Sequence, residues 1–452
     1  MTEKSLRFWS GVKVIFSEVS NKFDSIWQKR KRTLNSQILV AFLLKLVQSK
    51  NKQGYGSNLA EFWESCIEKG VSLPQDKSVS ASSLCEARAK LPEDIFIALN
   101  KALLAHWNES FESPNFQGFR LFAIDGSRIN VPRELLKEGY KLYNEKIGQY
   151  YPQGLLSCMY NLQEKVIYDC DFFSHMNERL CALEHMKILG NKDIMIFDRG
   201  YFSYLLFYQL LEHNVQGIFR LQEGGTNEEI FSFWQSADED KIIEYNPSNT
   251  VKHDLKKQGY NLDFKTLKMR LIKHKIGDQT YVYATTLIDK ALFPGECFAE
   301  IYHERWGIEE LYKISKRFIE IEDFHAKTAR GVKQELYSHI LLINLSRFFE
   351  FEAQNFIPPA DKKSNDKYQS DNKYFNPINL ISINFKNCID VVSRNLGNFI
   401  LGTFNVLSNL VDRIIDSISR IRQKIRPNRH YQRISRKPGS KWTSYGNQRA
   451  KA

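Results

Sequence analysis

The chain contains 452 residues, of which 42% are hydrophobic and 26% are charged, and its formal net charge is +12. This composition is ordinary for a folded globular protein and excludes fibrous and wholly disordered chains. No stretch approaches the roughly eighteen uninterrupted apolar residues of a membrane span, so no membrane association is predicted. The seven cysteines are scattered without metal-binding spacing, which favours reduced thiols and a cytoplasmic location.

The positive charge is concentrated at the C-terminal end. Residues 417–452 contain eleven Lys or Arg and no Asp or Glu, whereas residues 1–416 are nearly neutral. A basic tail that also carries aromatic residues suits a polyanion such as nucleic acid. A solvated tail without a partner is the simpler interpretation, so charge alone does not establish DNA binding.

Residues 1–110 are predicted to form a helical region that binds DNA ends. Three helices are expected, at 34–48, 57–69 and 80–91. Two short helices joined by a turn, with Arg88 and Lys90 on the second, resemble a helix-turn-helix, which makes these two residues candidate DNA contacts. Many helical bundles that do not bind DNA share this pattern.

The pattern changes to alternating strands and helices after residue 110. Strands are predicted at 119–124, 155–162, 166–173, 193–197 and 217–221. Helices are expected at 177–190, 203–213, 298–318 and 330–350. Three strands, a helix, a strand, a helix, a strand and a helix is the order of the α/β ribonuclease H-like fold. In that fold the first and fourth strands are neighbours at the centre of the sheet.

The predicted catalytic core covers residues 111–350 and contains a β-rich insertion at about 222–293. A polar stretch at 351–378, rich in Asn, Asp, Lys and Ser, is expected to be a linker. Residues 379–452 are predicted to form a helical C-terminal region that ends in the basic tail.

Two aspartates follow apolar strands that the fold would place side by side. Asp125 comes after the first predicted strand, and Asp198 comes after the fourth. Two close carboxylates repel each other, and a hard divalent cation is the natural way to keep both ionised. Taken singly, Asp125 is more simply explained as part of an Asp-Gly turn and Asp198 as a helix cap.

A third acid lies on the predicted helix 298–318. Tyr302, Arg305, Glu309 and Lys316 are spaced by three, four and seven residues, so they fall within an arc of about 60° on one helical face. A carboxylate can hold metal while the neighbouring cations hold backbone phosphate. Alone, Glu309 could simply form a surface ion pair.

The spacing Tyr-x2-Arg-x3-Glu-x6-Lys resembles the signature of DDE transposases of the IS-four insertion-sequence type. The segments around Asp125 (Ile-Asp-Gly-Ser) and Asp198 (Phe-Asp-Arg-Gly-Tyr) resemble the two aspartate motifs of that family. The resemblance covers roughly residues 78–347, and the family also carries a β-rich insertion between its second aspartate and its glutamate.

The resemblance implies a function in DNA transposition in the bacterial cytoplasm, at the nucleoid. Asp125, Asp198 and Glu309 would be the catalytic residues and would bind two Mg²⁺ (or Mn²⁺) ions. Tyr302, Arg305 and Lys316 would contact DNA. The enzyme would hydrolyse phosphodiesters at the terminal inverted repeats and join the freed ends to target DNA, as a homodimer in a synaptic complex.

Two assignments stay open within this family. Glu178 is either an acid placed favourably at a helix start or a contributor to the site. Trp234, Tyr281 and Tyr283 are candidates for stacking on a base flipped out of the duplex, although each is more simply explained as packing within the insertion.

Two other functions are compatible with the same residues. The chain could be a catalytically inactive relic or inhibitor of transposition that only binds DNA, which the complete set of three acids argues against. It could also be a metal-dependent nuclease of the same fold, which would cut DNA without joining it.

Overall fold

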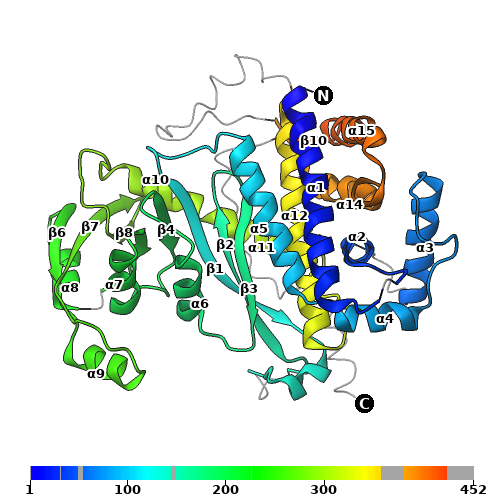
Figure 1. Cartoon of the computed structure of the whole chain (residues 1–452). Coiled ribbons are helices and arrows are strands. Elements are labelled where there is room, and N and C mark those ends of the chain that lie inside the picture. Colours follow the sequence, from blue (N-terminus) through cyan, green and yellow to red (C-terminus); the bar gives the residue numbers. More distant parts are fainter. Residues whose placement is uncertain are drawn as a thin grey trace.

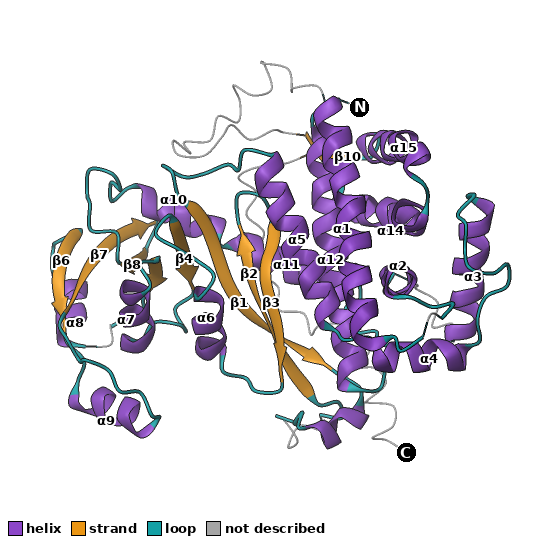
Figure 2. Ribbon diagram, viewed as in Figure 1, coloured by secondary structure: helices purple, strands orange, loops and turns teal. Residues whose placement is uncertain are grey.

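The computed structural model describes residues 2–30, 32–48, 54–143, 149–224, 227–357 and 381–424. One half of the molecule is built around a sheet with helices on both faces, and the other half consists of packed helices (Figures 1 and 2). Within the described residues, no helix is both long and apolar enough to cross a membrane. The predicted linker and basic tail fall mostly at 358–380 and 425–452, outside the described residues.

The sheet has eight strands in the order β3-β2-β1-β4-β5-β8-β7-β6. Its strands are β1 (Arg120–Asn130), β2 (Gln153–Asn161), β3 (Val166–Phe173), β4 (Asp193–Phe197), β5 (Gln216–Arg220), β6 (Asp240–Tyr245), β7 (Leu267–Ile276) and β8 (Gln279–Thr285). β1, β2 and β3 are antiparallel, whereas β4 and β5 run parallel to β1. This arrangement of the first five strands confirms the predicted ribonuclease H-like α/β fold.

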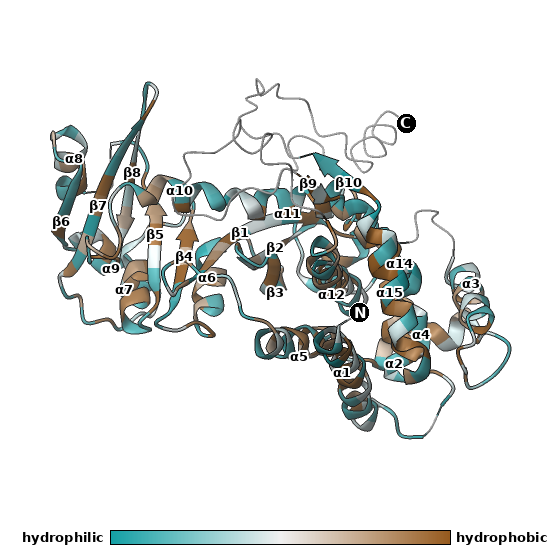
Figure 3. Ribbon diagram, turned by 90° about the horizontal axis from the view of Figure 1, so that it is seen from above, coloured by the Kyte–Doolittle hydropathy of each residue, from teal (hydrophilic) through white to brown (hydrophobic). Residues whose placement is uncertain are grey.

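Both faces of the central strands are apolar. Along β1, Leu121 and Ala123 join one hydrophobic cluster, whereas Phe122 and Ile124 join another on the opposite face. Because side chains alternate along a strand, this pattern requires helices on both faces. α6 (Glu178–Met186) and α7 (Tyr204–Glu212) cover one face, and α10 (Cys297–Glu304), α11 (Trp306–Arg317) and α12 (Ala329–Gln354) cover the other. β4 is coloured mostly hydrophobic in Figure 3.

The predicted insertion at 222–293 continues the core sheet. β8 pairs with β5, and β7 and β6 follow beyond it. The insertion also contains two helices, α8 (Glu228–Gln235) and α9 (Asn249–Lys257). Its strands are therefore held to the catalytic core by backbone hydrogen bonds.

The N-terminal and C-terminal helices form one packed body around α12. They are α1 (Glu3–Trp27), α2 (Ser36–Leu46), α3 (Tyr55–Glu68), α4 (Ala81–Lys90), α5 (Asp94–Ser110), α14 (Phe385–Leu401) and α15 (Leu407–Ser419). α12 touches α2, α4, α5, α14 and α15, as well as β3. The helices predicted as two terminal regions thus share a single hydrophobic core.

The predicted helix-turn-helix is not present. α3 ends at Glu68 and α4 begins at Ala81, so the segment 69–80 separates them. A helix-turn-helix needs a turn of about three or four residues. Short elements complete the described chain: 3-10 turns at Arg133–Glu138 and Phe404–Val406, and a small pair of strands, β9 (Ile381–Ile383) and β10 (Arg422–Lys424).

Candidate active site

The structure brings the two predicted aspartates to the same face of the sheet. β1 extends to Asn130, so Asp125 lies within a strand and not in a turn, which corrects the sequence-based expectation. β1 pairs with β4 only as far as Ala123 and Ile196, and Asp198 directly follows β4. Strand alternation places both carboxylates on the face covered by α11.

The predicted helix 298–318 is divided at Arg305 into α10 and α11. The N–H of Arg305 donates to the carbonyl of Tyr302 at 3.2 Å, and the N–H of Ile308 donates to the carbonyl of Arg305 at 3.1 Å. These hydrogen bonds join residues three apart, as in a 3-10 helix, and tighten the turn locally. α11 continues from α10 beyond this turn. The four signature residues therefore stay on the side that faces the sheet.

Two hydrogen bonds connect the signature residues to the acids. The Tyr302 hydroxyl donates to Oδ1 of Asp198 at 3.1 Å, and the Arg305 guanidinium donates to Oε1 of Glu309 at 2.6 Å. Arg305 is only 6% exposed, whereas the side chain of Glu309 is 36% exposed, so the carboxylate side of this ion pair is open to solvent. Lys316 donates from Nζ to the backbone carbonyl of Arg128 at 2.6 Å, which braces the far end of β1.

The acids affect one another's protonation. The pKa of Asp125 is raised to about 6, chiefly by burial and to a smaller extent by the nearby charges of Glu178 and Glu309. The backbone N–H of Gly126, 2.9 Å from Oδ1 of Asp125, and the charge of Arg305 act in the opposite direction. Burial also raises the pKa of Glu178, with a contribution from Asp198. Asp125 is therefore within electrostatic reach of Glu178 and Glu309, and Glu178 is within reach of Asp198.

These residues supply only hard oxygen donors, the type that Mg²⁺ and Mn²⁺ prefer. In that respect the donor set fits a divalent cation. Among the described residues, no three His, Cys, Asp or Glu side chains are close enough to form a metal site. The carboxylates are instead held by protein donors: Asp125 by a backbone N–H, Asp198 by Tyr302 and Glu309 by Arg305.

Residues 117–345, just over half of the chain, match the family described as "Transposase DDE domain". The chain belongs to this family. It is 23% identical over 286 residues to the transposase InsG for insertion sequence element IS4 from Escherichia coli (strain K12), and the match covers 62% of this chain and 63% of that protein. It thus spans less than two thirds of the relative's length. Among solved structures it is similar to the piggyBac transposase in a synaptic complex with hairpin DNA, with a TM-score of 0.42 and 12% identity over 90% of this chain and 83% of that one.

Two of the three aromatic candidates of this DDE-family chain line an open hollow of about 410 Å³. Trp234 and Tyr281 border it, together with Arg220, whose guanidinium lies 4.7 Å from the centre of the Tyr281 ring. Tyr283 is only 2% exposed and packs 5.2 Å from the ring of Tyr302. Tyr283 is therefore part of the core and is not available to stack on a base.

The structure contradicts the prediction that Arg88 contacts DNA. Arg88 is 5% exposed and forms an ion pair of 2.9 Å with Glu335 on α12. It also donates to Gln334 at 3.2 Å and to the Tyr55 hydroxyl at 2.7 Å. Its guanidinium joins three helices and cannot reach a phosphate in this arrangement. Lys90 is exposed, and its role in DNA binding stays a prediction.

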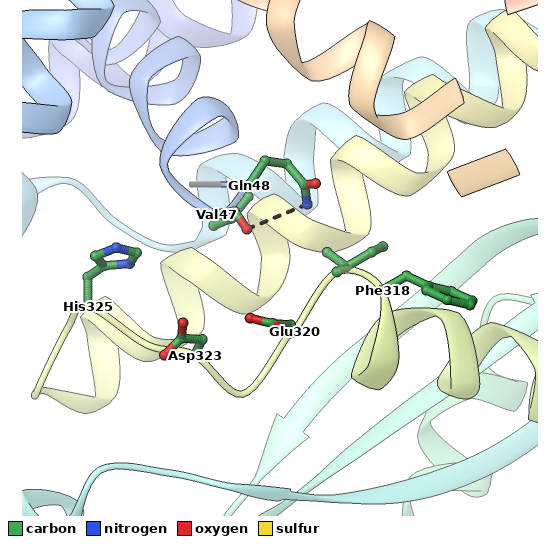
Figure 4. A pocket seen from close by; sticks show the side chains of 7 residues that line it. Val47, Gln48, Phe318, Glu320, Asp323 and His325 are labelled. Carbon is green, nitrogen blue, oxygen red and sulfur yellow. Dashed lines mark hydrogen bonds between the residues drawn. The ribbon is translucent and has the colours of Figure 1, made fainter. Parts of the chain in front are cut away.

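A small crevice between the end of α2 and the segment that follows α11 is shown in Figure 4. It is lined by Val47, Gln48, Phe318, Ile319, Glu320, Asp323 and His325. Its volume of about 10 Å³ has room for roughly one water molecule. This crevice is too small to be a substrate site for a transposase of the DDE family.

Sequence patterns missed two tyrosines beside the acids. The hydroxyl of Tyr312, on α11, donates to the backbone carbonyl of Asp125 at 2.8 Å. Tyr201, in the turn after β4, is 2% exposed and lies near Glu178 and Asp125. Tyr201 is the last residue of the segment Phe-Asp-Arg-Gly-Tyr, which resembles the family's second aspartate motif. Its place in that motif could therefore have indicated that it lies near the acids. Nothing in the spacing of Tyr312 indicates a role.

Proposed function

We propose that this chain is a DNA transposase that cleaves transposon ends by metal-dependent hydrolysis and joins the freed ends to target DNA. The observation that supports the proposal is that Asp125 and Asp198 lie on the sheet face covered by α11, the helix that carries Glu309. Membership of the transposase DDE domain family supports it.

Asp125, Asp198 and Glu309 would hold the catalytic cations, which we propose to be Mg²⁺ with Mn²⁺ as a substitute. Bound metal would supply an activated water and would stabilise the charge that develops on the leaving 3′ oxygen. Tyr302 and Arg305 hold Asp198 and Glu309 by hydrogen bonds of 3.1 and 2.6 Å. These two residues would orient the carboxylates for ligation.

Lys316 would hold a phosphate beside the scissile bond, whereas Arg305, which is buried and paired with Glu309, would act through that carboxylate. Lys316 uses one of its three donor protons on the carbonyl of Arg128, which leaves the others for a phosphate. Tyr302, which is buried, would orient Asp198. Trp234 and Tyr281, at the open hollow in the insertion, would offer an aromatic surface to a displaced base.

The proposed partners are the terminal inverted repeats, the target DNA and a second copy of the chain in a synaptic homodimer. The excess of positive charge at 417–452 supports binding to a polyanion. The relative that is similar in sequence is a transposase of an insertion sequence. Action on chromosomal DNA would place the protein at the bacterial nucleoid.

The test uses the full-length protein and a duplex that ends in the inverted repeat of its own element. Asp125→Asn, Asp198→Asn and Glu309→Gln should each abolish cleavage in Mg²⁺ and leave end binding nearly unchanged, because these side chains are assigned to metal and not to DNA. An exposed-acid variant, Glu310→Gln, is the control. Wild-type cleavage by any one of the three would remove that residue from the site.

The same assay separates a transposase from a nuclease of the same fold. A transposase joins the freed 3′ ends to a supercoiled target plasmid, whereas a nuclease cuts without joining. Products that contain cleaved ends but no joined plasmid would contradict the proposed strand-transfer activity.

A further inference from the structure

Glu178 reaches the acidic site from the face of the sheet opposite to Glu309. It is the first residue of α6, which packs on the same face as Phe122 and Ile124. β1 and β4 stop pairing after Ala123 and Ile196, so the part of β1 that carries Asp125 is no longer paired with β4. Asp125 can therefore be approached by Glu309 from the face covered by α11 and by Glu178 from the face covered by α6.

The residue after Asp125 leaves room for Glu178. A Cβ atom added at Gly126 would lie 2.9 Å from Cγ and 3.1 Å from Cδ of Glu178, and 2.8 Å from Cδ1 of Leu155. The backbone of Gly126 is regular strand, so the glycine does not serve a turn. Its missing side chain instead lets the Glu178 carboxyl group pack directly on the strand that carries Asp125.

The start of α6 is anchored on both sides of Glu178. The Asn177 side chain accepts a hydrogen bond from the N–H of Leu180 at 3.2 Å. The Arg179 guanidinium donates to the carbonyl of Gly200, in the turn after Asp198, at 2.8 and 3.0 Å. The start of α6 is therefore tied directly to the turn that follows Asp198.

A buried chain of hydrogen bonds holds the C-terminal end of the same helix. His185 lies 3.0 Å from Oγ of Ser157 on β2 through Nε2, and 2.8 Å from Oδ2 of Asp169 on β3 through Nδ1. Ser157 and His185 are at most 2% exposed, so these hydrogen bonds serve to position the helix. They fix the C-terminal end of α6 on β2 and β3.

An unsatisfied polar group also points into this space. The hydroxyl of Tyr201 faces Glu178 and Asp125. It interacts with the Glu178 carboxylate and lowers the pKa of that group, but among the described residues this contact does not reach the geometry of a normal hydrogen bond. A buried hydroxyl without a partner is costly, so a bound group that accepts or donates here would satisfy it. The site is reachable from solvent, because an open hollow is lined by Met176, Asn177, Glu178, Arg179 and Gly200.

We propose that Glu178 is a fourth carboxylate of the active site and that it binds a divalent cation together with Asp125 and Asp198. This inference rests on the proposed function. Glu178 would ligate the cation directly or through a bound water held by Tyr201. The simpler explanation is that Glu178 only stabilises the positive end of the α6 dipole. The two explanations differ in what the removal of its charge does to metal binding and to the metal-free fold.

The test measures Mn²⁺ binding to the full-length protein without DNA, by electron paramagnetic resonance of free Mn²⁺. The variants are Glu178→Gln, Asp125→Asn and, as a matched control, Glu184→Gln, an exposed acid on the same helix. We expect Glu178→Gln to weaken Mn²⁺ binding at least tenfold and to reduce the rise in melting temperature that Mn²⁺ produces. Glu184→Gln should bind like wild type.

Melting without metal provides the second readout. If Glu178 belongs to the acid cluster, Glu178→Gln removes repulsion and the metal-free melting temperature stays equal or rises. A lower metal-free melting temperature with unchanged Mn²⁺ affinity would establish the helix-end role and overturn the proposal. If Asp125→Asn weakens Mn²⁺ binding and Glu178→Gln does not, Glu178 is not a metal ligand, but the proposed metal centre at Asp125 stands. Unchanged binding in both variants would reject the metal centre of the proposed function itself.

Discussion

The hydroxyl of Tyr312 donates a hydrogen bond of 2.8 Å to the backbone carbonyl of Asp125 and lies 3.1 Å from the carbonyl of Leu156. This one buried side chain ties α11, which carries Glu309, to β1 and β2. Tyr312 therefore controls the distance between Glu309 on α11 and Asp125 on β1, although it needs no contact with DNA or metal.

Tyr312→Phe should lower both stability and cleavage. The loss of one buried hydrogen bond should reduce the free energy of unfolding by about 1 kcal/mol. A small shift of α11 relative to β1 should reduce the rate of end cleavage by roughly tenfold to a hundredfold. Urea unfolding and single-turnover cleavage measure the two effects, with the exposed Tyr143→Phe as control. Full activity in a destabilised Tyr312→Phe would show that the contact is structural only.

The raised pKa of Asp125 predicts how stability depends on pH without metal. Because folding raises its pKa from 3.8 to about 6, the folded state holds the proton more tightly than the unfolded state. The free energy of unfolding should therefore fall as pH rises from about 4 to about 6, and the full penalty, at most about 3 kcal/mol, applies above that range.

Asp125→Asn should remove this penalty, so its stability advantage over wild type should grow between pH 4 and pH 6. Saturating Mg²⁺ should remove the advantage at pH 7.5 by stabilising the ionised wild type. Urea unfolding at several pH values measures both effects, with the exposed Asp278→Asn as control. An advantage that does not change with pH would contradict the raised pKa.

Lys316→Met should slow end cleavage and leave Mn²⁺ affinity unchanged. An ammonium group cannot ligate a cation, but it can hold a phosphate beside the scissile one, and a misplaced phosphate costs roughly a hundredfold in rate. Lys313→Met is the matched control, because Lys313 is exposed on the same helix and pairs with Glu310 at 3.0 Å. A Lys316→Met defect that extra Mn²⁺ fully rescues would assign Lys316 to metal affinity instead.

Arg88→Met should destabilise the helical half. It would leave the buried carboxylate of Glu335 without its 2.9 Å partner, which costs roughly 3 to 5 kcal/mol. Lys90→Met, at an exposed position, should leave stability unchanged and weaken end binding by the loss of one phosphate contact, with a shallower salt dependence. Thermal melting and end-binding titrations over a range of salt concentrations distinguish these roles. Unchanged stability in Arg88→Met would mean that the buried pair contributes little.

The sequence by itself predicted the core strands in chain order and singled out the three candidate acids. Apolar runs such as 193–197 match β4 residue for residue, because alternation and length are local properties of the chain. The spacing of Tyr302, Arg305 and Glu309 is also local, since residues three and four apart share one helix face. Such features can be read without knowing what packs against them.

Only the tertiary structure decided which polar residues face one another. Arg88 looks like a surface cation in sequence, but in the fold it is buried and forms an ion pair with Glu335, which lies far along the chain. Asp125 looks like a turn residue, but pairing with β2 keeps it inside β1. Glu178 acquires its place near Asp125 because β1 is no longer paired with β4 there and Gly126 has no side chain. Each outcome depends on contacts between segments distant in sequence, whose free energy no local pattern contains.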